Sequence, residues 1–223
     1  MTDSVAGVAH LISVNAGRPR PIEHSDLSVT GIDKRPVDGF VSITVPGPKG
    51  TEPTGVEGDQ ICDTRHHGGP DQAVYAYARE DLDWWAGELG RELPGGVFGE
   101  NLTTAGLDVN GARVGERWLI GDAVLEVCAP RIPCRTFAAW LGERGWIKRF
   151  TEVARCGAYL RVVQPGRVRA GDGIQVVYAP EHDVTIELVF RALTTESDLL
   201  PRLLDAGEAL PGRTREKVLA RLQ

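Results

Sequence analysis

The chain has no apolar run that approaches the roughly 18 uncharged residues of a membrane-spanning helix. Residues 1–17 have no basic segment and no clear cleavage site, which argues against a secretory signal. The four cysteines are widely spaced, form no Cys-x-x-Cys pair, and are not needed as disulfides in a chain of 223 residues. We therefore expect a cytoplasmic protein with reduced thiols and no membrane partner.

Positive charge is also scarce, because 25 basic residues face 31 acidic ones and the net charge is −6. General nucleic-acid binders are usually basic, so we expect no nucleic-acid partner, although a local basic pocket for a phosphorylated ligand remains compatible with this balance. Apolar residues make up 42% of the chain and charged residues 25%, which is ordinary for a globular protein.

Short β-like runs separated by glycine and proline turns dominate the first four-fifths of the chain. Residues 40–45 and 123–128 alternate as strands do, whereas residues 78–89 have the spacing of an amphipathic helix. Gly-Asp pairs at 121–122 and 171–172 predict two hairpins. Seven or eight short strands with one or two helices favour a mainly β, α+β fold built on a closed β-barrel.

The pattern changes near residue 180, where leucine clusters broken by prolines and glycines begin. We expect a β-barrel domain at residues 1–180 and a small helical domain at residues 181–223. Its two or three short helices would dock on the barrel or on a partner, and a homodimer is one arrangement that this permits.

Cys134 lies in the segment 130–135, where two prolines precede it and Arg131 and Arg135 stand on either side. Thiolate is the nucleophilic and metal-binding form of cysteine, and neighbouring cations lower a thiol pKa. The segment is therefore either the setting of a working thiol or a strand end that holds a small, inert side chain.

A second polar cluster precedes the β-like residues 73–77, and Asp63 and Asp71 flank it. Its glycines permit positive φ angles and close approach of the backbone to a ligand. The cluster is denser than a surface loop requires, and it predicts a site. Its members are Arg65, His66, His67, Gly68 and Gly69.

Two further stretches leave alternatives open. Lys34 and Arg35 precede a proline and are expected to be extended, either as solvated surface charges or as cations for a ligand. Glu100 and Asn101 follow a Phe-Gly turn that either presents them to a pocket or is stabilised locally without a further role.

In combination these motifs resemble the MOSC domain, which is named for the C-terminal domain of molybdenum cofactor sulfurases. The resemblance extends to small stand-alone bacterial proteins that carry three helices after the barrel and are linked to resistance to N-hydroxylated purines. The segments that carry it, in the order of the family, are Gly58-Asp59, His67-Gly68-Gly69, Phe98 to Leu102, Gly121-Asp122, Pro130 to Cys134 and Gly171-Asp172.

The resemblance implies a pocket for molybdenum cofactor, with Cys134 as the metal ligand and His67 as the proton donor in the reduction of an N-hydroxylated substrate. The sequence has no flavin, haem or iron–sulfur motif, so electrons would come from a separate donor protein. Residues expected to hold the cofactor or substrate are Arg131, Arg65, Lys34, Arg35, Gly68, Gly69, Glu100 and Asn101.

Three other readings remain open at the level of sequence. Cys134 and His67 could serve as the nucleophile and base of a hydrolase. A zinc site could draw on Cys62, His66, and Cys128 or Cys134, although their spacing matches no familiar zinc pattern. The chain could also be a non-catalytic carrier or sensor of molybdenum cofactor or sulfur, or a binder of a pyridoxal-type ligand.

Overall fold

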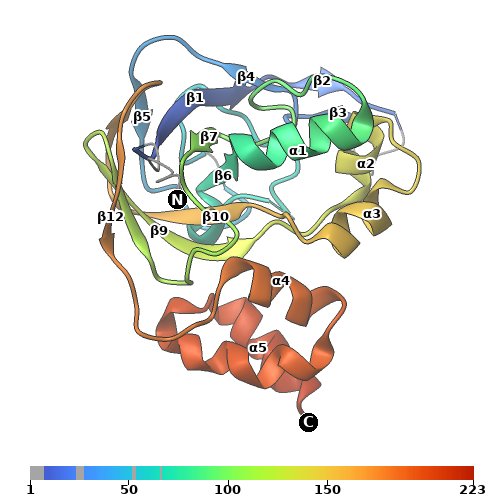
Figure 1. The fold of residues 1–223 in the computed structure, drawn as a ribbon. Helices are drawn as coiled ribbons and strands as arrows, with labels where there is room; N and C mark the ends of the chain where they lie inside the picture. The colour runs from blue at the N-terminus through green and yellow to red at the C-terminus, as the bar shows by residue number, and fades with distance from the viewer. Residues whose placement is uncertain (1–7, 24–27, 52–53, 66) are drawn as a thin grey trace, which may run out of the picture.

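The computed structural model describes residues 8–23, 28–51, 54–65 and 67–223, which form an α+β fold (Figure 1). Its helices are η1 Pro70–Gln72, α1 Arg79–Leu89, α2 Arg135–Leu141, α3 Trp146–Val153, α4 Ile186–Thr194, η2 Ser197–Ala209 and α5 Gly212–Arg221. Its strands are β1 His10–Gly17, β2 Arg20–Pro21, β3 Val29–Thr30, β4 Lys34–Pro36, β5 Val41–Ile43, β6 Val74–Ala78, β7 Leu102–Ala105, β8 Arg117–Ile120, β9 Ala123–Pro130, β10 Ala158–Gln164, β11 Gly166–Val168 and β12 Ile174–Tyr178.

Eight strands form one mixed sheet in the order β12-β8-β9-β10-β6-β7-β1-β4. The pair β6–β7 is parallel and the other neighbours are antiparallel. The start of β12 also meets β1, where Leu11 N donates to Asp172 O at 2.9 Å and Ile174 N donates to Ala9 O at 2.7 Å. Within the described ranges, the two end strands of this order, β12 and β4, do not pair with each other. The strand pairs therefore do not show the closed barrel that the sequence predicts.

One of the two expected hairpins is confirmed and the other is wrong. Gly121-Asp122 joins β8 to β9, which pair directly. Gly171-Asp172 lies between β11 and β12, but β11 pairs with β5 and β12 pairs with β8. The physical reason is that this turn binds to β1 instead, where Gly171 N donates to Leu11 O at 2.8 Å. The contact with β1 directs β12 away from β11.

An aromatic cluster fills the space between the sheet and helices α1, α2 and α3, which lie near one another in Figure 1. Phe137 on α2 contacts Phe98 with ring centroids 5.2 Å apart, and Phe150 on α3 at 5.3 Å. Burial of such large rings is a major source of stability. Trp85 on α1 and Trp146 on α3 complete the cluster and are fully buried.

Helices α4, η2 and α5 lie together at one end of the molecule (Figure 1). The hydroxyl of Thr185 caps α4 by accepting a hydrogen bond from Leu188 N. The buried face of α4 packs on the β part of the chain, and its Phe190 ring lies 6.2 Å from that of Phe150. Among the described helices, none has the length and apolar character to cross a membrane.

Glu100 is fully buried at the turn between Phe98 and β7. Its carboxylate accepts hydrogen bonds from Gly96 N at 2.5 Å, Phe98 N at 3.0 Å and the hydroxyl of Thr103 at 3.0 Å. Burial raises the pKa of Glu100. The residue therefore shapes the turn from inside the core.

We expect Glu100→Gln to lower the free energy of unfolding by about 1–3 kcal/mol, because an amide has one acceptor oxygen and leaves a buried N–H unpaired. Because the folded-state pKa of Glu100 is raised, the advantage of the native protein over the variant is greatest at low pH and shrinks as pH rises through that pKa. Urea unfolding across a pH series measures both effects. Glu152→Gln on the surface of α3 is the control, and a difference that grows with pH would contradict the assignment.

Candidate functional site

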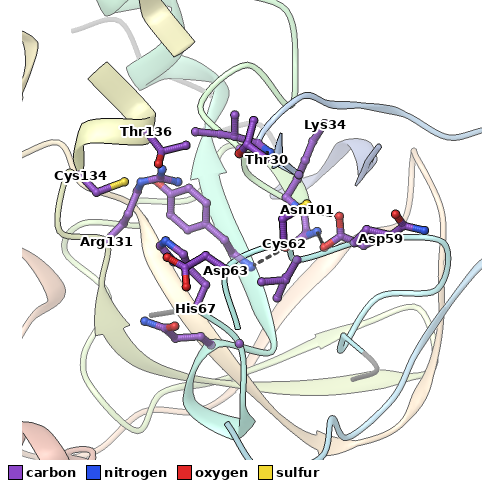
Figure 2. Close-up of a pocket in the computed structure, with 18 of the residues that line it drawn as sticks. Thr30, Lys34, Asp59, Cys62, Asp63, His67, Asn101, Arg131, Cys134 and Thr136 are labelled. Atoms are coloured by element: carbon purple, nitrogen blue, oxygen red, sulfur yellow. Dashed lines mark hydrogen bonds and ion pairs between the residues drawn. The ribbon is translucent and has the colours of Figure 1, made fainter. Parts of the chain in front are cut away.

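A pocket with a volume of about 360 Å³ lies at the junction of β4, β6, the end of β9 and the loop that precedes η1 (Figure 2). It brings together segments that are far apart in the sequence. The expected site residues that line it are Lys34, His67, Gly68, Asn101, Arg131 and Cys134. The expected residues that do not line it are Arg35, Arg65, Gly69 and Glu100.

Arg131 is the most deeply buried cation of the pocket, with 5% of its surface exposed. Its Nη1 donates to Phe98 O at 2.8 Å, and its guanidinium lies 4.2 Å from the Phe137 ring centroid and 5.2 Å from that of Tyr75. No ion pair of Arg131 with a carboxylate is recorded in the described part of the chain, and its buried Nε has no hydrogen-bond partner there.

The surroundings keep this guanidinium charged. Burial by itself lowers the pKa of Arg131, but the neighbouring Tyr159, Tyr75 and Cys134 raise it, and the net shift is upward. A buried charge normally has an ionic partner, because desolvation of an unpaired ion is costly. An unpaired guanidinium that faces a pocket therefore favours an anionic ligand.

Cys134 is a half-buried free thiol at the N-cap of α2. Its extended backbone (φ −130°, ψ 171°) ends the segment after β9 and places the side chain on the pocket wall. Figure 2 shows Cys134, Arg131 and Thr136 on the same side of the pocket. Cys134 and Arg131, two of the site residues expected from the sequence, therefore lie beside each other in the structure.

His67 and Asp63 come from the loop ahead of η1, where His67 N donates to Asp63 O at 3.0 Å. Gly68 and Gly69 follow with positive φ angles of 81° and 84°. A Cβ atom at Gly69 would lie 3.1 Å from the Lys49 backbone nitrogen, so the tight loop requires glycine there. Arg65 is exposed, and His66, a member of the polar cluster and of the alternative zinc site, lies outside the described residues.

Lys34 lines the pocket, but its ammonium group has a partner that the sequence analysis missed. It pairs with the carboxylate of Asp59, and both side chains are buried, with 9% and 3% of their surfaces exposed. Asp59 also accepts from Gly17 N at 2.6 Å and from Asn101 Nδ2 at 3.0 Å. The signal in the sequence is the Gly58-Asp59 pair, and the structure shows that Gly58 has the positive φ angle (76°) of a turn.

The remaining expected residues have other roles in the structure. Arg35 pairs with Asp33 at the surface, and 70% of its side chain is exposed, because β4 directs it away from the pocket. Glu100 faces the core. Asn101 lines the pocket while its Oδ1 accepts from Tyr75 N at 3.1 Å, so it is both a structural and a pocket residue. No cluster of three metal-ligating side chains was found in the described ranges, which lack His66.

A family model described as the MOSC domain matches residues 63–175, which include His67, Asn101, Arg131 and Cys134. The chain belongs to the MOSC domain family.

Individual relatives agree with this classification. The uncharacterized protein YflK of Bacillus subtilis is 32% identical over 182 residues, which span 81% of this chain and 79% of YflK. A Gibberella moniliformis protein named Reductase is 29% identical over 85% of this chain, which spans only 34% of the fungal protein. The crystal structure of YiiM from Geobacillus stearothermophilus has a TM-score of 0.76 at 26% identity and covers 96% of this chain and 100% of its own.

We expect Arg131→Met to leave the free energy of unfolding unchanged or to raise it by up to about 2 kcal/mol, because the variant removes an unpaired buried charge and keeps its apolar volume. We also expect inorganic phosphate to raise the melting temperature of the native protein but not that of the variant, because the variant lacks the cation. Calorimetry with and without phosphate measures both quantities, with Arg117→Met at an exposed ion pair as the control. A clear decrease in the free energy of unfolding of the variant would instead show that Arg131 is a structural residue.

Proposed function

We propose that this pocket binds molybdenum cofactor and that the protein reduces N-hydroxylated compounds. The observation that carries the proposal is the unpaired, buried guanidinium of Arg131 next to the half-buried thiol of Cys134 in one pocket. The cofactor that the family resemblance implies is an anionic pterin that holds its metal through sulfur. A cation without an ion-pair partner and a free cysteine that can ligate a metal fit these two needs.

The donor set of the pocket divides between the two halves of such a ligand. Cys134 would ligate the metal, because a soft thiolate suits a metal already bound by sulfur. Arg131 would bind the phosphate or the negative charge of the dithiolene, and the backbone at Gly68 would allow close approach. When bound, the cofactor would supply the two electrons of the reaction.

The proposed reaction is R–NHOH + 2 e⁻ + 2 H⁺ → R–NH₂ + H₂O, in which the N–O bond breaks and an N–H bond forms. The departing oxygen must take up a proton to leave as water. His67 lines the pocket and is the proposed donor of that proton. Hydroxylaminopurines are the proposed substrates, in line with the resemblance to proteins linked to resistance against them.

The electrons would reach the pocket from a separate donor protein. The fungal relative named Reductase, which is about three times as long as the matched region, supports an oxidoreductase reading of this family member. We infer that a separate redox protein delivers electrons to this chain, whereas a longer protein could carry an electron-donating domain in its additional sequence.

We expect protein purified from a cofactor-producing host to contain molybdenum, and Cys134→Ala to contain none, because the proposed metal ligand is gone. Elemental analysis measures the ratio of metal to protein. The control is Cys128→Ala, since that buried thiol lies outside the pocket and donates to Asp71 O at 3.0 Å. An equal ratio of molybdenum to protein in the native protein and in Cys134→Ala would contradict the assignment of Cys134 as the metal ligand. Stoichiometric binding without turnover of N-hydroxylated substrates would favour a carrier.

We expect His67→Ala to lower kcat by about 10²-fold or more while KM changes little, because a positioned acid contributes to the transition state rather than to binding. The measurement is steady-state reduction of a hydroxylaminopurine with an artificial electron donor. His10→Ala is the control, because His10 lies on β1 outside the pocket. An unchanged kcat would remove His67 as the proton donor.

A further inference from the structure

The pocket has two polar ends of different electrostatic character. Cys134 and Arg131 form one end, and Lys34, Asp59 and Asn101 form the other, with His67 and Asp63 on a wall of their own (Figure 2). The Arg131 end carries a positive charge that has no ion pair in the described part of the chain. At the other end the positive charge of Lys34 is matched by the negative charge of Asp59. An anion therefore gains more at the first end, and a neutral polar group suits the second.

The Lys34–Asp59 pair retains unused hydrogen-bonding capacity. An ionised carboxylate has about four acceptor positions, and an ammonium group has three donors. In the described residues Asp59 Oδ1 accepts from Gly17 N and Lys34 Nζ, whereas Oδ2 accepts from Asn101 Nδ2 alone. Lys34 Nζ donates only to Asp59 among the recorded hydrogen bonds. One acceptor position on Oδ2 and two donor hydrogens on Nζ thus remain unused on two residues that line the pocket.

Other contacts hold the pair rigidly in place. Gly17 N fixes one carboxylate oxygen, and Asn101 Nδ2 fixes the other while also donating to Asn15 O at 3.2 Å. The bay formed by Lys34, Asp59 and Asn101 is therefore an acceptor held beside a donor in a shielded position. Such an arrangement discriminates strongly, because a ligand that fails to match it leaves buried polar groups unpaired.

Aromatic side chains also line the pocket. Tyr75 and Tyr159 both line the pocket, and their ring centroids lie 5.0 Å apart. The hydroxyl of Tyr75 donates to Cys156 O at 2.8 Å, so that its ring rather than its polar end is available to a ligand. The face of an aromatic ring packs well against a planar ring system.

We propose that the Lys34–Asp59–Asn101 bay binds the 2-aminopyrimidine edge of a planar heterocycle. The exocyclic amino group donates to Asp59 Oδ2, and the adjacent ring nitrogen accepts from Lys34 Nζ. This inference rests on the proposed function for its biological meaning, where the heterocycle is the pterin of the cofactor. A guanine-type base has the same edge, and the experiment separates the two sources.

The test measures the affinity of the purified protein for 6-hydroxymethylpterin and for 6-hydroxymethyl-lumazine, in which an oxygen replaces the 2-amino group. Neither probe contains metal, phosphate or dithiolene. We expect the native protein to prefer the pterin by at least tenfold, because the oxygen of the lumazine would oppose the Asp59 carboxylate. In Asp59→Asn that preference should shrink, because the asparagine amide can turn either its oxygen or its NH₂ group toward the ligand, and in Lys34→Gln, which keeps the carboxylate, it should persist at lower overall affinity.

Glu100→Gln is the matched control, because Glu100 is another buried carboxylate but does not line the pocket. It should keep the preference for the pterin even if its melting temperature falls. If Asp59→Asn fails to fold, the pterin-to-lumazine ratio of the native protein and of Lys34→Gln still decides the matter. No preference in the native protein, or a full preference in folded Asp59→Asn, overturns the proposal.

Guanosine and inosine, which differ in the same 2-amino group, form the second arm. Discrimination of the pterin pair alone assigns the bay to the cofactor, and discrimination of the guanosine pair alone assigns it to a purine substrate. The outcome is independent of metal content. Preference for the amino compound in protein that never acquires molybdenum would refute the proposed function and retain the bay, whereas molybdenum binding without any preference would do the reverse.

Discussion

The side chain of Asn101 is the contact on which both the sheet and the pocket depend. Its Oδ1 accepts from Tyr75 N on β6, and its Nδ2 donates to Asn15 O on β1 and to Asp59 Oδ2. The β6–β7 pair is the parallel step of the sheet, and Asn101 precedes β7 at that step. One amide therefore satisfies backbone groups of two strands and orients the acid of the pocket, so the geometry of the bay follows from the geometry of the sheet.

The opposite end of the pocket shows a different balance of stability and function. The guanidinium of Arg131 is held by two aromatic rings and one carbonyl instead of a carboxylate. Cation–π contacts recover only part of the cost of burying a charge. Lys34, by contrast, has its counter-ion built into the fold. Arg131 thus has no ion pair at the end of the pocket where the proposed ligand would bring negative charge. Lys34 is neutralised by Asp59 at the end where the proposed ligand would be uncharged.

Local pattern was sufficient for several features. Alternation predicted β9, helical spacing predicted α1, and the loop composition around Cys134 and His67 marked two segments that the fold brings to one pocket. Two of the errors concern distant partners. The capture of the Gly171 turn by β1 and the pairing of Lys34 with Asp59 join segments that sequence spacing does not relate. Glu100 and Asn101 are adjacent and equally polar, yet one faces the core and the other the pocket.

The aromatic cluster has a consequence for how the molecule unfolds. Phe137, which lies under the guanidinium of Arg131, touches Phe150, and Phe150 touches Phe190 on α4. The wall of the pocket and the C-terminal helices therefore share one unbroken block of packed rings. Densely packed interiors transmit strain. Unfolding of the C-terminal helices should therefore loosen the wall of the pocket, although none of their residues lines it.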